Sequence, residues 1–154
     1  MTAAMKIGVV VNASAGGGKG ARVWNRVEGE LKRRGVEYRA VRTSAPKEAA
    51  ELARRLAHDD GCGIVACVGG DGTAGETAHG LIGTDAVFAY VPAGSGNDFA
   101  RSLRLGADPA RAVETLLHGK VRRIDAGFAG ERLFLNSFGA GFDGEVVRRA
   151  NGSL

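Results

Sequence analysis

The chain has 154 residues, of which 44% are apolar and 25% are charged, and its formal net charge is +4. This length and balance predict one ordinary globular domain that can bury a core without disulfides or metals, and the glycines are not periodic, so a collagen-like chain is excluded. The mild positive charge suits phosphates or an anionic membrane surface, whereas scattered basic residues and 6% aromatic residues argue against nucleic acid as a partner.

Along the chain, short apolar runs alternate with amphipathic segments. The β-branched runs predict buried parallel strands, and apolar residues at helical spacing predict helices that cover them. The expected strands cover residues 7–11, 36–41, 63–68 and 87–91. The expected helices cover residues 22–34, 47–58, 73–81, 99–103 and 109–117, and Asp108 is expected to cap the last of them. This order predicts an α/β fold, with a parallel, Rossmann-like sheet between two layers of helices.

The pattern changes after residue 121. Two further runs, residues 121–125 and 133–138, predict strands on either side of a turn at Ala129-Gly130. We therefore expect an antiparallel hairpin that leads into a second, β-rich domain. The predicted division is a first domain in residues 1–128 and the beginning of a truncated second domain in residues 129–154, as in a piece of a longer protein.

Glycine is the compositional outlier, with 25 residues, and it clusters in loops that follow three predicted strands. These glycine loops cover residues 14–20, 69–75 and 92–98. In open parallel sheets, ligands bind at the carboxyl ends of strands, and bare backbone N–H groups next to helix N-termini bind anions. The sequence therefore predicts a site for a phosphate-bearing ligand at one edge of the sheet.

Common nucleotide motifs describe the first glycine loop poorly. The loop lacks the Ser or Thr that follows the lysine of a Walker A motif, because Lys19 precedes Gly20. Gly16, Gly18 and Ala21 satisfy the dinucleotide fingerprint, but Thr43 stands where its acidic ribose partner is expected. From these residues alone, a dinucleotide site and purely structural turns both stay open.

Longer segments resemble a known family. Gly69-Gly70-Asp71-Gly72-Thr73 is similar to the GGDGT loop of diacylglycerol kinases, sphingosine kinases, NAD kinases and phosphofructokinases. Residues 92–103, PAGSGNDFARSL, resemble a segment specific to the lipid kinases, and residues 12–20 resemble their first glycine loop. Residues 124–127 and 138–143 match two later motifs. The chain thus resembles lipid kinases of the diacylglycerol kinase and sphingosine kinase type, which implies an NAD kinase/phosphofructokinase-like fold.

The resemblance also implies a site for ATP and Mg²⁺. The implied nucleotide-binding residues are Asn12, Ala13, Ser14, Ala15, Gly16, Thr43, Gly69, Gly70, Asp71, Gly72, Thr73, Ala74, Gly75, Glu76 and Ser95. Asp71, Asp98 and Asp125 correspond to acidic residues that the family uses in catalysis, around Mg²⁺ and its waters. Any of them could instead cap a helix, and Asp98, directly before Phe99, is the best candidate for a cap.

Three substitutions depart from the family pattern: Ala13 replaces proline, Gly75 replaces asparagine, and Ser95 replaces threonine. The larger departure is length, because the family's general base and much of its lipid site belong to a C-terminal domain. We expect an ATP-dependent lipid kinase that transfers the γ-phosphoryl group to a lipid hydroxyl, of which this chain is the nucleotide-binding half, inactive by itself. The alternatives are a kinase for NAD or a sugar phosphate, and a non-enzymatic nucleotide-binding remnant.

The implied partners are ATP, a lipid substrate presented at a membrane surface, and a second copy of the protein in a homodimer. Two cysteines make no disulfide framework, and the sequence shows neither a signal peptide nor an apolar stretch long enough to span a bilayer. We therefore expect a cytoplasmic protein, with a peripheral position at the inner membrane face as a further expectation.

Overall fold

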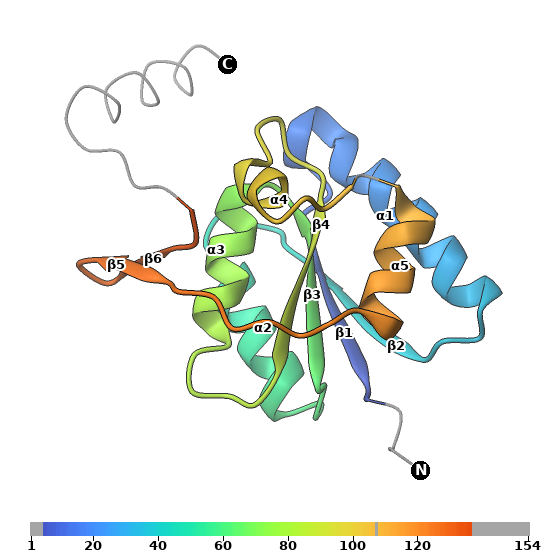
Figure 1. Ribbon diagram of the computed structural model, residues 1–154, viewed down its shortest axis with the longest axis horizontal. Coiled ribbons are helices and arrows are strands. Elements are labelled where there is room, and N and C mark those ends of the chain that lie inside the picture. The colour runs from blue at the N-terminus through green and yellow to red at the C-terminus, as the bar shows by residue number, and fades with distance from the viewer. Residues whose placement is uncertain (1–4, 107, 137–154) are drawn as a thin grey trace.

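The computed structural model describes residues 5–106 and 108–136. Strands and helices alternate, and a short hairpin follows them (Figure 1). The strands are β1 (Ile7–Val11), β2 (Tyr38–Arg42), β3 (Ile64–Gly69), β4 (Val87–Pro92), β5 (Gly127–Ala129) and β6 (Arg132–Phe134). The helices are α1 (Ala15–Arg33), α2 (Ala49–His58), α3 (Asp71–Gly80), α4 (Asp98–Ser102) and α5 (Pro109–His118). The alternation predicted from the sequence is therefore confirmed.

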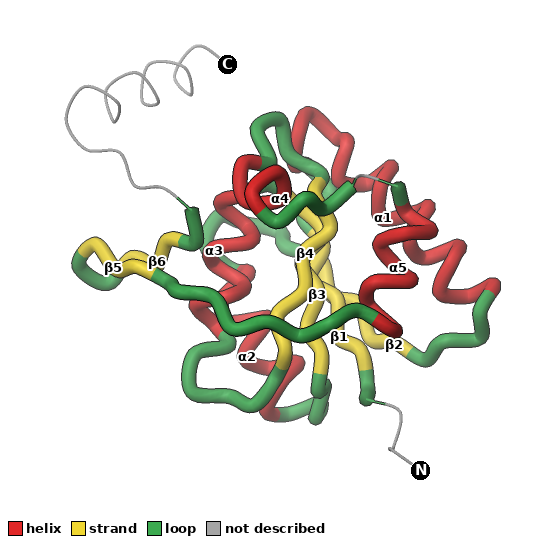
Figure 2. Tube along the Cα trace, in the orientation of Figure 1, coloured by secondary structure: helices red, strands yellow, loops and turns green. Residues whose placement is uncertain are grey.

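Four parallel strands form the central sheet in the order β2-β1-β3-β4 (Figure 2). β1 pairs along its whole length with both neighbours, so that Val9 lies between Ala40 of β2 and Ala66 of β3. From β1 the chain proceeds in one direction to β2 and in the other to β3 and β4. The strand order therefore reverses between β1 and β3, which is where open α/β sheets bind their ligands.

Helices cover both faces of the sheet, which gives three layers (Figures 1 and 2). On one face, Val9 and Val11 share a core with Trp24 of α1 and Val113 of α5. On the other face, Val10 shares a core with α2, and a further core joins β3 and β4 to α3 and α4. Successive side chains of a strand point to opposite faces, so an uninterrupted apolar run is what burial on both faces requires. The predicted α/β three-layer fold is confirmed.

The start of α1 differs from its prediction. The sequence predicts a loop over residues 14–20 and a helix from residue 22; α1 is bounded at Ala15, but Gly16, Gly17 and Gly18 are not in a helical conformation, so regular helix begins after Gly18. Gly16, Gly17 and Gly18 have φ values of 57°, 63° and 87°, a left-handed conformation that glycine adopts readily. The glycines therefore turn the chain within the first turn, and regular helix follows them. Although α1 has 19 residues, no helix in the described residues is apolar enough over sufficient length to cross a membrane.

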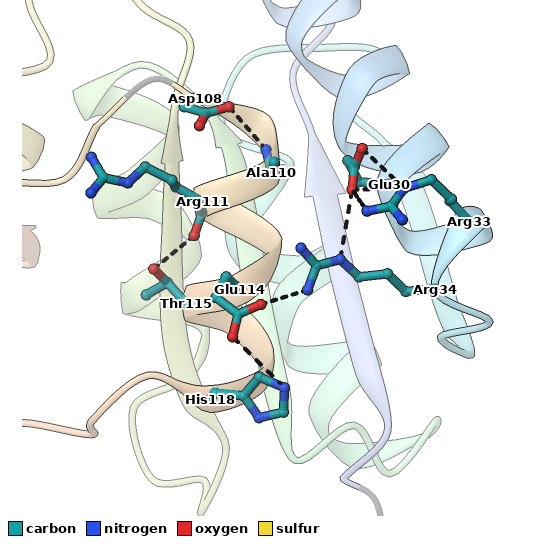
Figure 3. A network of polar contacts seen from close by, with 9 residues as sticks. All are labelled: Glu30, Arg33, Arg34, Asp108, Ala110, Arg111, Glu114, Thr115 and His118. Atoms are coloured by element: carbon teal, nitrogen blue, oxygen red, sulfur yellow. Dashed lines mark hydrogen bonds and ion pairs between the residues drawn. The ribbon is translucent and has the colours of Figure 1, made fainter.

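Polar contacts join the outer surfaces of α1 and α5 (Figure 3). Arg34, at the end of α1, places its Nη1 2.5 Å from Oε2 of Glu114 in α5 and its Nε 3.6 Å from Oε2 of Glu30. At the other end of α5, the Asp108 carboxylate accepts a hydrogen bond of 3.2 Å from the Ala110 N–H, so the predicted cap is confirmed. Arg34 and Glu30 are half-buried and Glu114 is exposed, and ion pairs this close to solvent contribute little to stability.

The segment after α5 contradicts one predicted strand. Residues 121–125 form no strand, and the side chains of Val121 and Ile124 are 69% and 46% exposed. β-branched residues favour strands only where a neighbouring strand or a packed face receives them, and none does so here among the described residues. The prediction of a strand over 121–125 is therefore wrong.

A hairpin forms around the predicted turn, but its first strand is β5 and not residues 121–125, and β6 begins one residue before the predicted strand over residues 133–138. β5 and β6 pair antiparallel, and Gly130, with a φ of 61°, turns the chain between them, which confirms the expected turn. Leu133 is buried, and β6 packs against α3, beside which the hairpin lies in Figure 1. The remainder of the second domain expected in residues 129–154, including the motif at residues 138–143, lies outside the described residues.

Candidate functional site

Three loops meet at the carboxyl edge of the sheet. We call them loop A (residues 12–18, after β1), loop B (residues 69–71, after β3) and loop C (residues 93–97, after β4). The Asn12 N–H donates to the carbonyl of Val68 at 2.9 Å, and the Ala93 N–H donates to the carbonyl of Gly69 at 2.7 Å. These bonds prolong the strand ladder into the loops, so the glycine loops predicted to share an edge do share it. They flank the point at which the strand order reverses.

The loops approach one another through bare backbone. A Cβ atom on Gly94 of loop C would lie 2.6 Å from the Cα of Gly70 in loop B. A Cβ atom on Gly16 of loop A would lie 2.6 Å from the Ala93 carbonyl oxygen. No side chain fits at these distances, so the sequence must place glycine at both positions. Backbone N–H groups without side chains over them are what an anion site needs.

Side chains also connect loop A to α3. The Asn12 side-chain amide donates to the Thr73 hydroxyl at 2.9 Å, and the Ser14 hydroxyl donates to the Asn12 side-chain oxygen at 2.9 Å. Asn12 is half-buried and Thr73 is buried. Thr43, on the far side of loop A, continues the β1–β2 pairing through its N–H, which donates to the Val11 carbonyl at 3.0 Å. The residues expected around the nucleotide at the ends of β1, β2 and β3 therefore lie at one edge.

Asp71 caps a helix, as the sequence left open, but the helix is α4 and not the one that Asp71 begins. It is the first residue of α3, and its carboxylate accepts hydrogen bonds from the backbone N–H groups of Asp98 and Phe99, both at 3.1 Å. These are the first N–H groups of α4, so Asp71 caps that helix from another element. The alternative that Asp98 caps this helix does not hold, because its carboxylate pairs with Arg101 on the exposed side of α4 and the acceptor comes from 27 residues earlier in the chain.

The three carboxylates predicted for Mg²⁺ are only partly brought together. Asp71 and Asp98 both border Gly96, with carboxylate oxygens 3.4 Å and 3.7 Å from the position of a Cβ atom there. Asp125 lies on the exposed segment between α5 and β5. Within residues 5–106 and 108–136, no three carboxylate, histidine or cysteine side chains are grouped as metal ligands would be. The assignment of all three to one ion stays a prediction.

The remaining predicted nucleotide-binding residues lie in loop C and in α3. Ser95 is exposed in loop C, and Gly75 and Glu76 are half-buried in α3, where a Cβ atom on Gly75 would lie 3.7 Å from the Leu133 carbonyl oxygen. A cavity of about 440 Å³ lies at the opposite, amino edge of the sheet and is lined in part by Met5. That cavity therefore lies away from the three loops.

Two residues that sequence reasoning missed organise loop C. Asn97 has a φ of 56°, and its side chain accepts from the Gly94 N–H and donates to the Gly94 carbonyl, both at 2.9 Å. The Tyr90 hydroxyl, buried at the end of β4, lies 3.2 Å from the Gly69 carbonyl and 3.3 Å from the Asn97 side-chain oxygen. Asparagine tolerates left-handed backbone and bonds to nearby main chain, so its place in a glycine loop was a usable signal. Tyr90 gave no such signal, because it occupies an ordinary core position of a strand.

Burial keeps two groups below the loops protonated. Desolvation is the main reason why the pKa of the Tyr90 hydroxyl is raised, and the nearby carboxylate of Asp71 raises it further. Desolvation likewise raises the pKa of the Cys67 thiol to about 12, against a lowering contribution from its hydrogen bond with Thr77. Tyr90 is therefore a hydrogen-bond donor at neutral pH, and Cys67 is a core thiol and not a nucleophile.

Comparisons with known proteins agree with this geometry. The family model described as the diacylglycerol kinase catalytic domain matches residues 6–129. A protein of Pseudomonas putida named "Probable lipid kinase YegS-like" is 40% identical over 88 residues, which are 56% of this chain and 30% of that protein. A protein of Staphylococcus carnosus named "Diacylglycerol kinase" is 30% identical over 148 residues, which are 95% of this chain and 48% of that protein.

A solved structure supports the fold independently. The crystal structure of a diacylglycerol kinase from Bacillus anthracis is similar with a TM-score of 0.73 at 24% identity, over 88% of this chain and 47% of that chain. The chain thus spans about half the length of the relatives that it matches over most of its own length. Since the family model covers most of the residues, including all three loops, the chain belongs to the diacylglycerol kinase catalytic domain family.

Proposed function

We propose that this chain is the nucleotide-binding half of an ATP-dependent lipid kinase. The observation that carries the proposal is the meeting of loops A, B and C through bare backbone at the reversal of strand order. Gly70 directly precedes α3, a helix of ten residues whose N-terminus favours negative charge. ATP is a ligand whose charged phosphates match such a surface, and membership of the family makes lipid phosphorylation the first reaction to test.

The proposed roles follow the positions of the residues. Residues 69–76 would receive the phosphates, and residues 12–16, Thr43 and Ser95 would border the rest of the nucleotide. In the proposed reaction, a lipid hydroxyl oxygen bonds to the γ-phosphorus, the bond to the β-phosphate oxygen breaks, and the hydroxyl proton passes to a base outside these residues. Phosphoryl transfer depends mainly on positioning and charge neutralisation, and this half supplies both for the nucleotide.

Asp71 and Asp98 fit a role near Mg²⁺, because both carboxylates border the bare backbone of loop C. Asp71 already accepts two N–H groups, so contact through water leaves its hydrogen bonds intact. Asp125 would join them from the segment after α5. When bound, the ion neutralises phosphate charge.

The lipid would meet ATP in a cleft of which this chain forms one wall. Because the chain spans about half the length of its relatives, we expect weak nucleotide binding and poor turnover by the chain alone. We further propose that residues 1–128 form the catalytic domain, that residues 129–154 begin a β-rich domain, and that the whole protein dimerises and works peripherally at the inner face of a membrane.

Nucleotide binding is tested by titrating the chain with ATP in a calorimeter, with and without Mg²⁺. The expected result is heat of binding for ATP that increases with Mg²⁺ and is absent for a variant with Gly94→Ala. The proposal would be contradicted if ATP added to the folded chain at millimolar concentration produced no heat of binding and no shift in melting temperature.

Lipid phosphorylation needs the longer protein. Radiolabelled ATP is offered with diacylglycerol or sphingosine in anionic vesicles, and with NAD and a sugar phosphate in parallel. Label in a lipid product supports the proposal, whereas label in NAD or the sugar phosphate assigns another kinase of the same superfamily. Rapid lipid phosphorylation by residues 1–154 alone would refute the half-site interpretation.

A further inference from the structure

The Tyr90 hydroxyl is the one side-chain group described at the ends of β3 and β4 that contacts both loop B and loop C. β4 pairs with β3 so that Tyr90 lies beside Cys67, two positions before each strand ends. Its ring is 7% exposed and lies 5.9 Å from the ring of Phe99, centre to centre. Its hydroxyl reaches past the end of the ladder to the carbonyl of Gly69 and the side chain of Asn97.

One proton is available for these two acceptors, since a hydroxyl has a single O–H. The Gly69 carbonyl also accepts the Ala93 N–H, and the Asn97 side-chain oxygen also accepts the Gly94 N–H. The Ala93 N–H already ties the first residue of loop C to Gly69, whereas the Tyr90 hydroxyl reaches the other end of loop C at Asn97. Without the hydroxyl, the side chain of Asn97 would still shape loop C, but it would lose its described hydrogen bond to β4.

A second brace runs in the opposite direction, from Asp71 of loop B to the first N–H groups of α4. The Tyr90 hydroxyl bonds to Gly69 and Asn97 from the end of β4, whereas the Asp71 carboxylate bonds to the first residues of α4, which follow loop C in the sequence. The two braces therefore hold loop C and the start of α4 to the end of β3 at two different points. The close approach of Gly94 to the backbone of Gly70 depends on that fixed spacing.

We propose that Tyr90 is a positioning residue of the nucleotide site: together with Asn97, it holds loops B and C at the spacing that a chain of phosphates requires. The identity of the ligand rests on the proposed function, whereas the brace itself does not. A phosphate chain must satisfy several N–H donors at once, so a small change in loop spacing weakens phosphate contacts and leaves contacts to the adenosine moiety unchanged.

Tyr90→Phe isolates the hydroxyl, because the ring and its packing against Phe99 are kept. Tyr38→Phe is the matched control: its hydroxyl donates to Glu28 at 2.8 Å, at the amino edge of the sheet and away from all three loops. Asn97→Gly is an independent variant that retains easy access to the left-handed backbone while losing the side-chain clamp.

The dissociation constants of ATP and of adenosine are measured for the parent and the three variants. In Tyr90→Phe and Asn97→Gly, the constant for ATP is expected to rise about three- to tenfold, the value of one hydrogen bond, while that for adenosine is unchanged. Tyr38→Phe should bind both like the parent. Unchanged ATP binding in Tyr90→Phe, or an equal loss for adenosine, would overturn the proposal.

Hydrogen exchange of the chain without ligand tests the brace separately. Peptides covering residues 69–76 and 94–103 should exchange faster in Tyr90→Phe than in the parent, and at the parent's rate in Tyr38→Phe. If the parent binds no ATP, the proposed function fails and the role in nucleotide affinity fails with it, while faster exchange still supports the brace. Unaltered exchange in both segments would refute the brace whatever the ligand.

Discussion

Replacing Asp71 with alanine removes a helix cap as well as a charge from the proposed Mg²⁺ site. The carboxylate accepts two N–H groups of α4 at 3.1 Å, and it is half-buried at the end of loop B. Loss of activity in an Asp71 variant therefore has two possible causes, and the free energy of unfolding separates them. Asp98→Asn is the matched control, because that side chain pairs only with exposed Arg101.

The expected cost follows from the bonds that are lost. Removing a capping side chain costs about 0.5–2 kcal/mol, and two bonds to one charged, half-buried group place Asp71→Ala in the upper part of that range. Asp71→Asn keeps one acceptor oxygen but loses the charge, so about half of that cost is expected. Asp98→Asn should change stability by about 0.5 kcal/mol or less, as is usual for an exposed pair.

Urea unfolding followed by circular dichroism gives these free energies. The three variants should unfold with the slope of the parent and with midpoints in the order parent, Asp98→Asn, Asp71→Asn, Asp71→Ala. An Asp71→Ala variant as stable as the parent would refute the capping role. If Asp71→Asn proves nearly as stable as Asp98→Asn yet abolishes Mg²⁺-dependent ATP binding, its role at the ion is supported apart from its role in folding.

Three further results are expected. Gly94→Ala should lower stability by about 1–3 kcal/mol in thermal melts because its Cβ atom would enter the backbone of loop B, whereas Gly72→Ala meets no atom within 4 Å and should be nearly neutral. Backbone N–H groups of the preceding turn hold the pKa of Glu48 below its usual value near 4.5. The difference in unfolding free energy between the parent and Glu48→Gln should therefore be full above pH 4.5 and shrink as the pH falls through the lowered pKa. A difference that stays constant over this pH range would contradict the prediction. Cys67 should resist alkylation at neutral pH until the chain unfolds, and native-state labelling at the rate of a free thiol would exclude its burial.

Local patterns were sufficient for most of the fold. Apolar runs that are buried on both faces leave a continuous signal in the sequence, and β1, β3 and β4 all carry it. The glycine loops could be assigned to one edge because every parallel strand ends there. The prediction of a strand over residues 121–125 was wrong for the corresponding reason. Val121 and Ile124 have strand-forming side chains, but a strand also needs a neighbouring strand, and the segment's own sequence does not show whether one is present.

The site was less predictable than the fold, because its important contacts join distant residues. The sequence suggested a local cap at Asp98, yet the acceptor for α4 is Asp71, and the N–H groups that it receives are 27 and 28 positions away. Tyr90 reads as a core residue of β4, and only the register with β3 brings its hydroxyl to Gly69. A pattern of residue types predicts which loops would bind phosphate, but the groups that set the distance between those loops are found only in three dimensions.

The contacts around loops B and C bear on how complete the proposed half-site is. Loop B is joined to loop C by Tyr90 and by the contact of Gly70 with Gly94, and to the start of α4 by Asp71, all within this chain. The surface proposed to bind phosphate is therefore formed by residues of this chain, and little of it would have to be ordered when a nucleotide binds. If closure supplies mainly the lipid site and the exclusion of water, the longer protein should gain far more in turnover than in affinity for ATP. A longer protein that binds ATP many orders of magnitude more tightly than residues 1–154 would show instead that the missing half shapes the nucleotide site itself.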